Sequence, residues 1–149
     1  MYLLDTQLFA DFVSADPDNP VYTRATSFVT LAEQRHLRVS ISVVTIGMIR
    51  SEVSQLPAGP IRGNWERRLD AAAHSWSQST QLYEVDWKTV ESWAIVKVMD
   101  LRDAAGDVLG DDERLVVATA LAHSLRLVTS TPEIYAPVAQ ALGLNIEAV

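Results

Sequence analysis

Short apolar or β-branched runs alternate along this chain with longer segments of helical periodicity. Such runs predict strands at residues 2–4, 38–44, 82–85, 125–128 and 145–149. Each connection between successive strands is too long for a hairpin and long enough to hold a helix, so the strands should be parallel. A parallel sheet needs helices on both faces. The sequence therefore predicts an α/β fold with a central parallel sheet of four to five strands, in one domain over residues 1–149.

Helices are predicted where apolar residues recur at i, i+3, i+4 and i+7, with capping residues at their starts. One helix is expected directly after the first strand and another after the second strand, with Thr45 as the N-cap of the latter. Three more are expected at 22–36, 65–76 and 132–142. The sequence thus supplies enough helices for both faces of the sheet.

Two further helices carry acidic caps. Asp86 is the expected cap of a helix over residues 87–102, and Asp111 or Asp112 that of a helix over 114–123. The residues expected to face inward on the first of these helices are Val90, Trp93, Ala94 and Val98.

Composition excludes several kinds of chemistry. The chain has 149 residues and no cysteine, which excludes disulfides, thiolate metal sites and a cysteine nucleophile. A reducing, cytoplasmic location is therefore expected. The N-terminus reaches Asp5 without a basic region, unlike a signal peptide. The apolar stretches are shorter than the roughly 20 residues needed to cross a bilayer.

The net charge of −7 is concentrated in one part of the chain. Residues 84–113 contain nine acidic and three basic residues, a sum of −6, whereas residues 1–70 contain eight acidic and seven basic ones. The total excludes a globally basic surface for nucleic acid but permits a local arginine-bearing strip. A local acidic surplus is typical of a solvated helix face and less often of a cation site.

The predicted fold places candidate residues at one edge of the sheet. Ligands of open α/β sheets bind beyond the carboxyl ends of the strands. Asp5, residues 45–48 and Thr131 follow strands there, and residues 111–113 start a helix that enters the same sheet. Asp5 is either a helix cap or, if the acids of residues 111–113 converge on it, part of a site for a hard cation such as Mg²⁺.

Three segments of the sequence carry a resemblance to a known family: YLLDT at 2–6, ISVVTIGMIR at 41–50 and LVVATALAHSLRLVTSTPEIY at 115–135. In order and spacing they resemble PIN-domain proteins, specifically the VapC-type toxin ribonucleases of bacterial toxin–antitoxin systems. The resemblance runs along nearly the whole chain. It implies a PIN fold and Mg²⁺- or Mn²⁺-dependent hydrolysis of RNA phosphodiesters.

The resemblance also implies roles for individual residues. Asp5 and Glu113 are the expected catalytic carboxylates and, together with Asp112, the expected metal ligands. Thr6 and Thr131 are expected to orient water or phosphate through their hydroxyl groups. The residues expected to contact RNA phosphates are Arg50, Arg67 and Arg68.

Several positions depart from the family pattern. Met48 stands where the family has Glu, and a thioether is a poor ligand for a hard cation. Ile134 stands in the place of the last acid, Gln7 in that of an Asn, and Thr131 in that of an Asn or Asp. Glu52 lies one turn after Met48 and would reach the site only through water or a shifted helix.

Three functions remain open on these residues. The first is a metal-dependent endoribonuclease with altered ligands, and the second is a catalytically impaired PIN-like module that binds a partner protein or RNA. Phosphoryl transfer on Asp5, as in haloacid-dehalogenase-like folds, is the third, although Gln7 stands where that chemistry needs a second Asp.

The resemblance further implies partners. These are an RNA substrate, a second copy of the chain in a homodimer, and a cognate antitoxin held in a groove near the first helices. Phe9, Phe12 and Phe28 are either lining residues of that groove or members of the core.

Overall fold

The computed structural model describes residues 1–16, 18, 20–79 and 81–149. Among these residues, five strands form one parallel sheet in the order β3-β2-β1-β4-β5. The strands are β1 (Tyr2–Leu4), β2 (Val39–Ser42), β3 (Leu82–Tyr83), β4 (Arg126–Thr129) and β5 (Ile146–Ala148). The predicted parallel α/β sheet is therefore confirmed.

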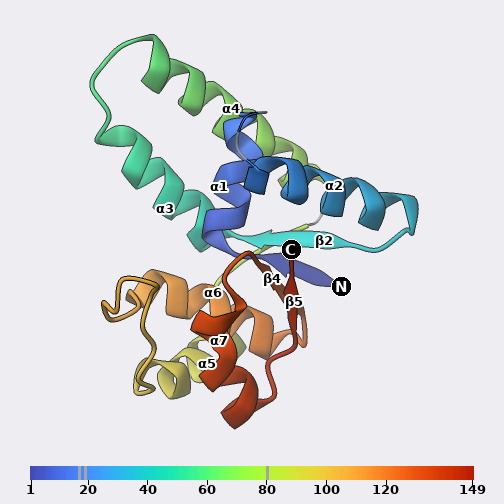
Figure 1. The fold of residues 1–149 in the computed structure, drawn as a ribbon, viewed down its shortest axis with the longest axis vertical. Coiled ribbons are helices and arrows are strands. Elements are labelled where there is room, and N and C mark those ends of the chain that lie inside the picture. The colour runs from blue at the N-terminus through green and yellow to red at the C-terminus, as the bar shows by residue number, and fades with distance from the viewer. Residues whose placement is uncertain (17, 19, 80) are drawn as a thin grey trace.

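Helices cover both faces of this sheet, as predicted (Figure 1). One layer consists of α1 (Thr6–Ser14), α2 (Pro20–Gln34), α3 (Val43–Ser54) and α4 (Pro60–Gln78). The other layer consists of α5 (Trp87–Lys97), α6 (Asp111–Ala122) and α7 (Pro132–Leu142). The first layer lies above the sheet in Figure 1 and the second below it.

Each face of the sheet has its own hydrophobic core. Successive strand residues point to opposite faces. Leu4 and Val128 accordingly pack into the core under α1 to α4, whereas Leu3 and Leu127 pack into the core over α5 to α7. The central strands are apolar on both sides because both sides are covered.

The strand order reverses next to β1. The chain passes from β1 to β2 and β3 on one side and then returns to β4 and β5 on the other. Ligands of open α/β sheets bind at such a switch point. Asp5 lies there, and its backbone N–H donates to the carbonyl of Val128 at 3.0 Å.

The predicted start of α3 is wrong. Ser42, not Thr45, is the N-cap, because its hydroxyl accepts a hydrogen bond from the N–H of Val44 at 3.2 Å. The predicted 38–44 strand therefore ends at Ser42. The β-branched run that follows suits a strand as well as a helix, and the serine cap decides between them. Thr45 lies inside the helix and is fully buried.

The start of α5 agrees with the prediction, but its end does not. Asp86 caps it as expected, accepting from the N–H of Thr89 at 2.9 Å. The helix ends at Lys97 rather than at residue 102. The residues after it turn back because Leu101 and Leu109 are both buried in the core.

The predicted inward face of α5 is also wrong. Thr89 and Val96 are the buried residues, and Trp93 is partly buried beside them. Val90, Ala94 and Val98 lie on the exposed side instead. Apolar residues occur on both sides of this helix, so periodicity alone does not show which side packs against α6.

α7 spans the predicted residues 132–142, whereas the other helix boundaries differ by a few residues. α6 begins three residues earlier than predicted, and its N-cap is Gly110 rather than Asp111 or Asp112. Both aspartates lie in its first turn, where carboxylates are stabilised by the helix dipole. α4 is longer than the predicted 65–76 and begins with Pro60, a residue suited to the first helical position. None of the described helices combines the length and the apolar character needed to cross a membrane.

Candidate active site

Asp5 links the end of the central strand to the start of α1. Its backbone is extended and its Oδ1 accepts a hydrogen bond from the N–H of Leu8 at 2.7 Å, which makes Asp5 the N-cap of α1. The Thr129 side chain, at the end of β4, hydrogen-bonds to the same carboxyl group. Two neighbouring strand ends therefore fix the orientation of Asp5 before any ligand arrives.

The pKa of the Asp5 carboxyl is shifted strongly by its surroundings. It is only 2% exposed. Burial raises its pKa to about 6, against the opposing effect of the hydrogen bonds from Thr129 and Leu8, and the negative charge of Asp11 adds to the rise. A buried carboxylate with this cost of ionisation is typical of a functional site.

Glu113 is the acid that the structure brings near Asp5. It lies half-buried in the first turn of α6. Burial raises its pKa, and the next largest cause is the negative charge of Asp5, followed by the charges of Asp103, Glu52 and Asp112. The two carboxylates are thus close enough for the charge of one to oppose ionisation of the other.

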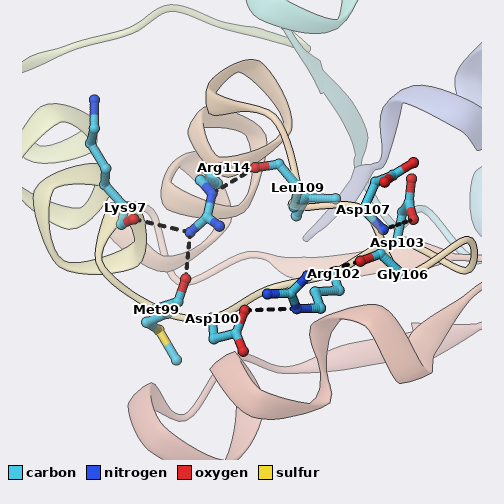
Figure 2. Close-up of polar contacts among 9 residues, drawn as sticks. All are labelled: Lys97, Met99, Asp100, Arg102, Asp103, Gly106, Asp107, Leu109 and Arg114. Carbon is cyan, nitrogen blue, oxygen red and sulfur yellow. Dashed lines mark hydrogen bonds and ion pairs between the residues drawn. The ribbon is translucent and has the colours of Figure 1, made fainter.

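Arg114, the residue after Glu113 in α6, binds backbone carbonyls of the segment that precedes this helix (Figure 2). Its guanidinium is buried and donates to the carbonyl of Leu109 at 2.8 Å, of Val96 at 2.7 Å and of Met99 at 2.9 Å. These carbonyls belong to the end of α5 and to both ends of segment 98–110. Their partial negative charge stabilises the buried cation. Arg114 therefore fixes where α6 starts relative to α5.

Segment 98–110 is folded back by its own polar groups (Figure 2). Asp103 Oδ1 accepts the N–H groups of Ala105 and Asp107, each at 2.9 Å. This turn holds Asp103 where its charge contributes to the raised pKa of Glu113.

Thr129 and Tyr135 are candidate site residues that the sequence reasoning missed. Thr129 is fully buried, and its Oγ1 also accepts the N–H of Thr131 at 3.0 Å. Tyr135 lies on α7 and is 5% exposed. Burial raises its pKa, and the charges of Asp5 and Glu113 raise it further. The apolar run before Thr129 is a sequence signal that could have pointed to this residue, whereas no sequence pattern indicated that the charges of Asp5 and Glu113 act on Tyr135.

Met48, at the position where the sequence resemblance implied a Glu, lies beside Thr6. Thr6 Oγ1 lies 3.5 Å from Met48 Sδ and 3.4 Å from Thr45 Oγ1. Since Ser42 rather than Thr45 is the cap, the capping-box position is residue 45, and Met48 lies three residues, nearly one turn, beyond it. The Thr6 hydroxyl therefore faces the thioether of Met48.

Gln7 and Ile134, two further positions where the resemblance implied other residues, lie outside the Asp5 carboxyl contacts described above. Gln7 is exposed, and its Nε2 donates to Asp11 at 3.2 Å, away from the core. Ile134 packs against the core under α7. Asp112 and Glu52 are exposed, and their negative charges contribute to the raised pKa of Glu113.

The acids around Asp5 offer a divalent cation few protein ligands. Within residues 1–16, 18, 20–79 and 81–149, no group of three or more His, Cys, Asp or Glu side chains lies close enough to hold a metal ion. Mg²⁺, however, is often held by one or two carboxylates and keeps several waters. A cation beside Asp5 and Glu113 would also offset the cost of ionising both. The pair therefore fits Mg²⁺ or Mn²⁺ with few protein ligands.

The three arginines expected to contact RNA are exposed on α3 and α4. Arg50 Nη2 lies 2.6 Å from Asp70 Oδ1. Arg67 donates to the Asn64 side chain and Arg68 to the carbonyl of Ser14 at the end of α1. Arg67 and Arg68 line a surface hollow of about 310 Å³.

A cavity of about 480 Å³ lies among α1, α2 and α4. Phe12 and Trp76 form its aromatic wall, and Glu33 supplies a carboxylate. Phe9 is fully buried in the core, and Phe28 packs edge-on against Tyr2 at 5.2 Å between ring centroids. Of the three phenylalanines expected to line a groove, Phe12 is the one that lines this cavity.

Known proteins share this architecture along their whole length. The sequence matches no protein-family model. A curated relative, the VapC ribonuclease Y4jK of Sinorhizobium fredii, is 24% identical over 146 residues, which cover 98% of this chain and 95% of the relative. A chain of the VapBC2 complex of Rickettsia felis bound to a promoter DNA fragment superimposes with a TM-score of 0.73 at 16% identity, covering 99% of this chain and 98% of that one. The chain has the VapC-like PIN fold.

Other solved structures agree with this VapC-like assignment. A chain of FitAB bound to IR36 DNA gives a TM-score of 0.70 at 18% identity and covers 99% of the VapC-like chain and 94% of its own. A chain of VapBC-5 of Mycobacterium tuberculosis gives a TM-score of 0.64 at 19% identity, covering 99% of this chain and 98% of that one. The PIN fold that the sequence resemblance implied is confirmed.

Proposed function

We propose that this VapC-like chain is a metal-dependent endoribonuclease that acts as a toxin, with an altered set of metal ligands. The observation that carries the proposal is the pairing of Asp5 and Glu113 at the switch point of the sheet, where burial and the charge of Asp5 raise the pKa of Glu113. The likeness to the VapC ribonuclease Y4jK supports RNA as the substrate. An RNA substrate and the absence of cysteine agree with a cytoplasmic location.

Carboxylates and hydroxyl groups of the chain would have separate roles at this site. Asp5 and Glu113 would hold Mg²⁺ or Mn²⁺, with Asp112 as a further ligand. When bound, the cation supplies charge stabilisation at the phosphate and lowers the pKa of water. The hydrogen bond from Leu8 keeps Asp5 in one orientation, so the site is largely preorganised. The Thr6 and Thr131 hydroxyls would orient water or phosphate.

Arginines outside this pair would bind the RNA backbone. Arg67 and Arg68 share one hollow on α4, and Arg50 lies on the neighbouring helix α3. Their present partners are neutral groups of the chain or the exposed Asp70. Exposed contacts of this kind contribute little to stability, so replacing them with contacts to RNA phosphates costs little free energy.

A polypeptide partner is the second part of the proposal. The solved neighbours of this chain include VapBC and FitAB complexes, which supports a cognate antitoxin as its partner. The cavity bounded by Phe12, Trp76 and Glu33 has the size and mixed lining that suit a partner side chain.

Met48 favours a second candidate function, a catalytically impaired PIN-like module that binds a partner protein or RNA. Its Sδ receives the Thr6 hydroxyl and offers a hard cation a poor ligand. In that case the binding surfaces are retained and the hydrolytic rate is lost.

The experiment is cleavage of structured RNA with Mg²⁺ or Mn²⁺ by the wild type and by Asp5→Asn and Glu113→Gln. Asn keeps the N-cap of α1 while removing the charge. We expect each variant to lose about 100-fold or more in rate. Asp86→Asn, which makes the same change at the cap of α5, should cleave at the wild-type rate.

Equal rates for Asp5→Asn and the wild type would contradict the assigned site. An inactive wild type that still binds RNA or a partner protein would favour the impaired module instead.

A further inference from the structure

Arg114 carries a positive charge into the interior of the protein, where backbone carbonyl groups surround it. The residue is 3% exposed. Its Nε donates to the carbonyl of Leu109 at 2.8 Å. Its Nη1 shares its donors among the carbonyls of Val96 at 2.7 Å, Met99 at 2.9 Å and Lys97 at 3.2 Å. So many contacts to one buried side chain indicate a specific structural task.

Two of these carbonyls belong to the last turn of α5. Val96 and Lys97 lie at the C-terminal end of that helix, where carbonyls lack partners in a following turn and the helix dipole is negative. The Arg114 guanidinium therefore caps α5 from a neighbouring helix. The dipole and the charge-assisted hydrogen bonds together offset the cost of burying the cation.

Arg114 also closes the first turn of its own helix, α6. Its backbone N–H donates to the carbonyl of Gly110, the N-cap, at 3.1 Å. Its side chain binds Leu109, the residue before that cap, and Leu109 is itself buried with its N–H donating to Leu101 at 2.8 Å. The first turn of α6 is thus tied to the end of α5 and to both ends of segment 98–110.

We infer that Arg114 is a positioning residue, which holds Glu113 where it can share a cation with Asp5. Glu113 directly precedes Arg114 in the first turn of α6, so a shift of this turn moves the carboxylate with it. A displacement of about 1 Å is enough to weaken a site of this kind severely. The inference rests on the proposed metal-dependent function of the Asp5 and Glu113 pair.

Only an arginine supplies this set of contacts. Its donors lie on one planar group in fixed directions, so a single side chain reaches carbonyls of α5 and of both ends of segment 98–110. A lysine carries the same charge on one nitrogen and reaches fewer of them. We therefore expect position, rather than charge alone, to be lost in Arg114→Lys.

The experiment measures Mn²⁺ binding by electron paramagnetic resonance, at a temperature where circular dichroism shows each variant folded. Arg114→Ala should raise the Mn²⁺ dissociation constant by about tenfold or more. The space left by the side chain matches a free guanidinium ion, and about 20 mM of that ion is far below denaturing concentrations. Guanidinium, but not urea at equal concentration, should restore about threefold or more of the lost affinity.

Arg114→Lys is the second variant and carries the test if Arg114→Ala does not fold. It should raise the Mn²⁺ dissociation constant by about threefold or more. Guanidinium should restore none of this loss, because the lysine side chain occupies the space.

Two variants serve as controls. Arg102→Ala removes an exposed arginine of segment 98–110, which donates to Gly106 at 3.0 Å, and should bind Mn²⁺ as the wild type does. Leu69→Ala removes a fully buried side chain from the core on the opposite face of the sheet. It should lower the thermal midpoint by roughly 5 °C or more and leave the Mn²⁺ dissociation constant unchanged, which separates position from stability.

Amide hydrogen exchange of residues 98–114 tests the placement of α6 without any metal. Exchange there should be about tenfold or more faster in Arg114→Ala, and guanidinium should slow it. Wild-type Mn²⁺ affinity in both Arg114 variants, an equal loss of affinity in Leu69→Ala, or unchanged exchange would overturn the inference and leave the ribonuclease proposal standing. A wild type that binds no Mn²⁺ would contradict the ribonuclease proposal, and exchange alone would then support or overturn the placement of α6 by Arg114.

Discussion

Asp5 and Asp86 occupy the same local position in two regions of the chain. Each has an extended backbone after a strand, caps the following helix and accepts the N–H of the third residue on, at 2.7 Å from Leu8 and 2.9 Å from Thr89. Their ionisation differs. Burial raises the pKa of Asp5 to about 6, whereas the hydrogen bond from Thr89 lowers the pKa of Asp86.

The difference comes from the place of each strand in the sheet. Asp5 follows the central strand β1 and is covered by the strand ends and helices around it, whereas Asp86 follows the edge strand β3 and remains in solvent. The cap is a local structure, but the electrostatic environment is a tertiary one. A capping carboxylate becomes a candidate catalytic group only where the fold buries it beside a second acid, as Glu113 is beside Asp5.

The largest expected effect on stability is at Asp5. Because its folded pKa of about 6 exceeds the ordinary 3.8, the native state binds the proton more tightly than the unfolded state does. The protonated Asp5 carboxyl therefore stabilises the fold fully below about pH 4, and this stabilisation is lost as pH rises through 6. The free energy of unfolding should change by about 3 kcal/mol over this range. Asp5→Asn should remove this pH dependence, measured as the free energy of unfolding in urea between pH 4 and 7.

Asp86→Asn should change the pH dependence in the opposite direction and in a lower range. The pKa of Asp86 is lowered, so its charged form stabilises the fold above about pH 4, and that stability is lost as pH falls below 3.8. The variant should lose stability at neutral pH relative to acid pH. Identical pH profiles for the two variants would remove the distinction between the two caps.

Met48→Glu tests whether a further carboxylate strengthens metal binding near Asp5. It places a third carboxylate on α3 beside Thr6, and we expect it to tighten Mn²⁺ binding by about tenfold. Calorimetry with Mn²⁺ gives the affinity. The same substitution in an Asp5→Asn background should bring little gain, because the added acid would lack its main partner.

Asp86→Ala tests the cap alone. It removes the acceptor for the N–H of Thr89 and should lower the thermal midpoint by roughly 3 °C, with Asp86→Asn recovering most of the loss at neutral pH. Far-ultraviolet circular dichroism follows the transition. RNA cleavage should be unchanged, and a loss of cleavage would mean that the two ends of the sheet are coupled.

His123→Gln should have the smallest effect. His123 Nε2 lies 3.4 Å from an oxygen of Asp86, and the histidine is a minor cause of the lowered pKa there. The His123 side chain is partly exposed and that of Asp86 is exposed, and ion pairs near the surface contribute little, so the thermal midpoint should move by less than about 2 °C. A larger shift would show that the ring packing of His123 on Tyr83, with centroids 4.9 Å apart, matters more than the ion pair.

Local sequence patterns were sufficient for the parallel sheet and for both aspartate caps. Asp5 and Asp86 each stand directly before a helical pattern, and a cap depends on only the next three residues. Position after an apolar run also placed Asp5 at the carboxyl edge of the sheet. These features follow from short-range chemistry and from the periodicity of the chain.

Features that depend on long-range contacts were not predictable in the same way. The buried guanidinium of Arg114 joins three segments, and its contacts set the start of α6 and the end of α5. The sequence pattern predicted that Val90, Ala94 and Val98 face inward, whereas packing on α6 buries the face with Val96. Tyr135 is part of one of the segments that carry the resemblance, but the effect of the Asp5 and Glu113 charges on its pKa follows only from the fold.

The most direct test of the central claim, that Asp5 and Glu113 share a divalent cation, is Mn²⁺ binding followed by electron paramagnetic resonance. Bound Mn²⁺ loses the sharp signal of the free ion. We expect the wild type and Asp86→Asn to reduce this signal equally, and Asp5→Asn and Glu113→Gln to weaken binding by about tenfold or more. A wild type that leaves the free signal intact, or an Asp5→Asn variant that binds as tightly, would contradict the account.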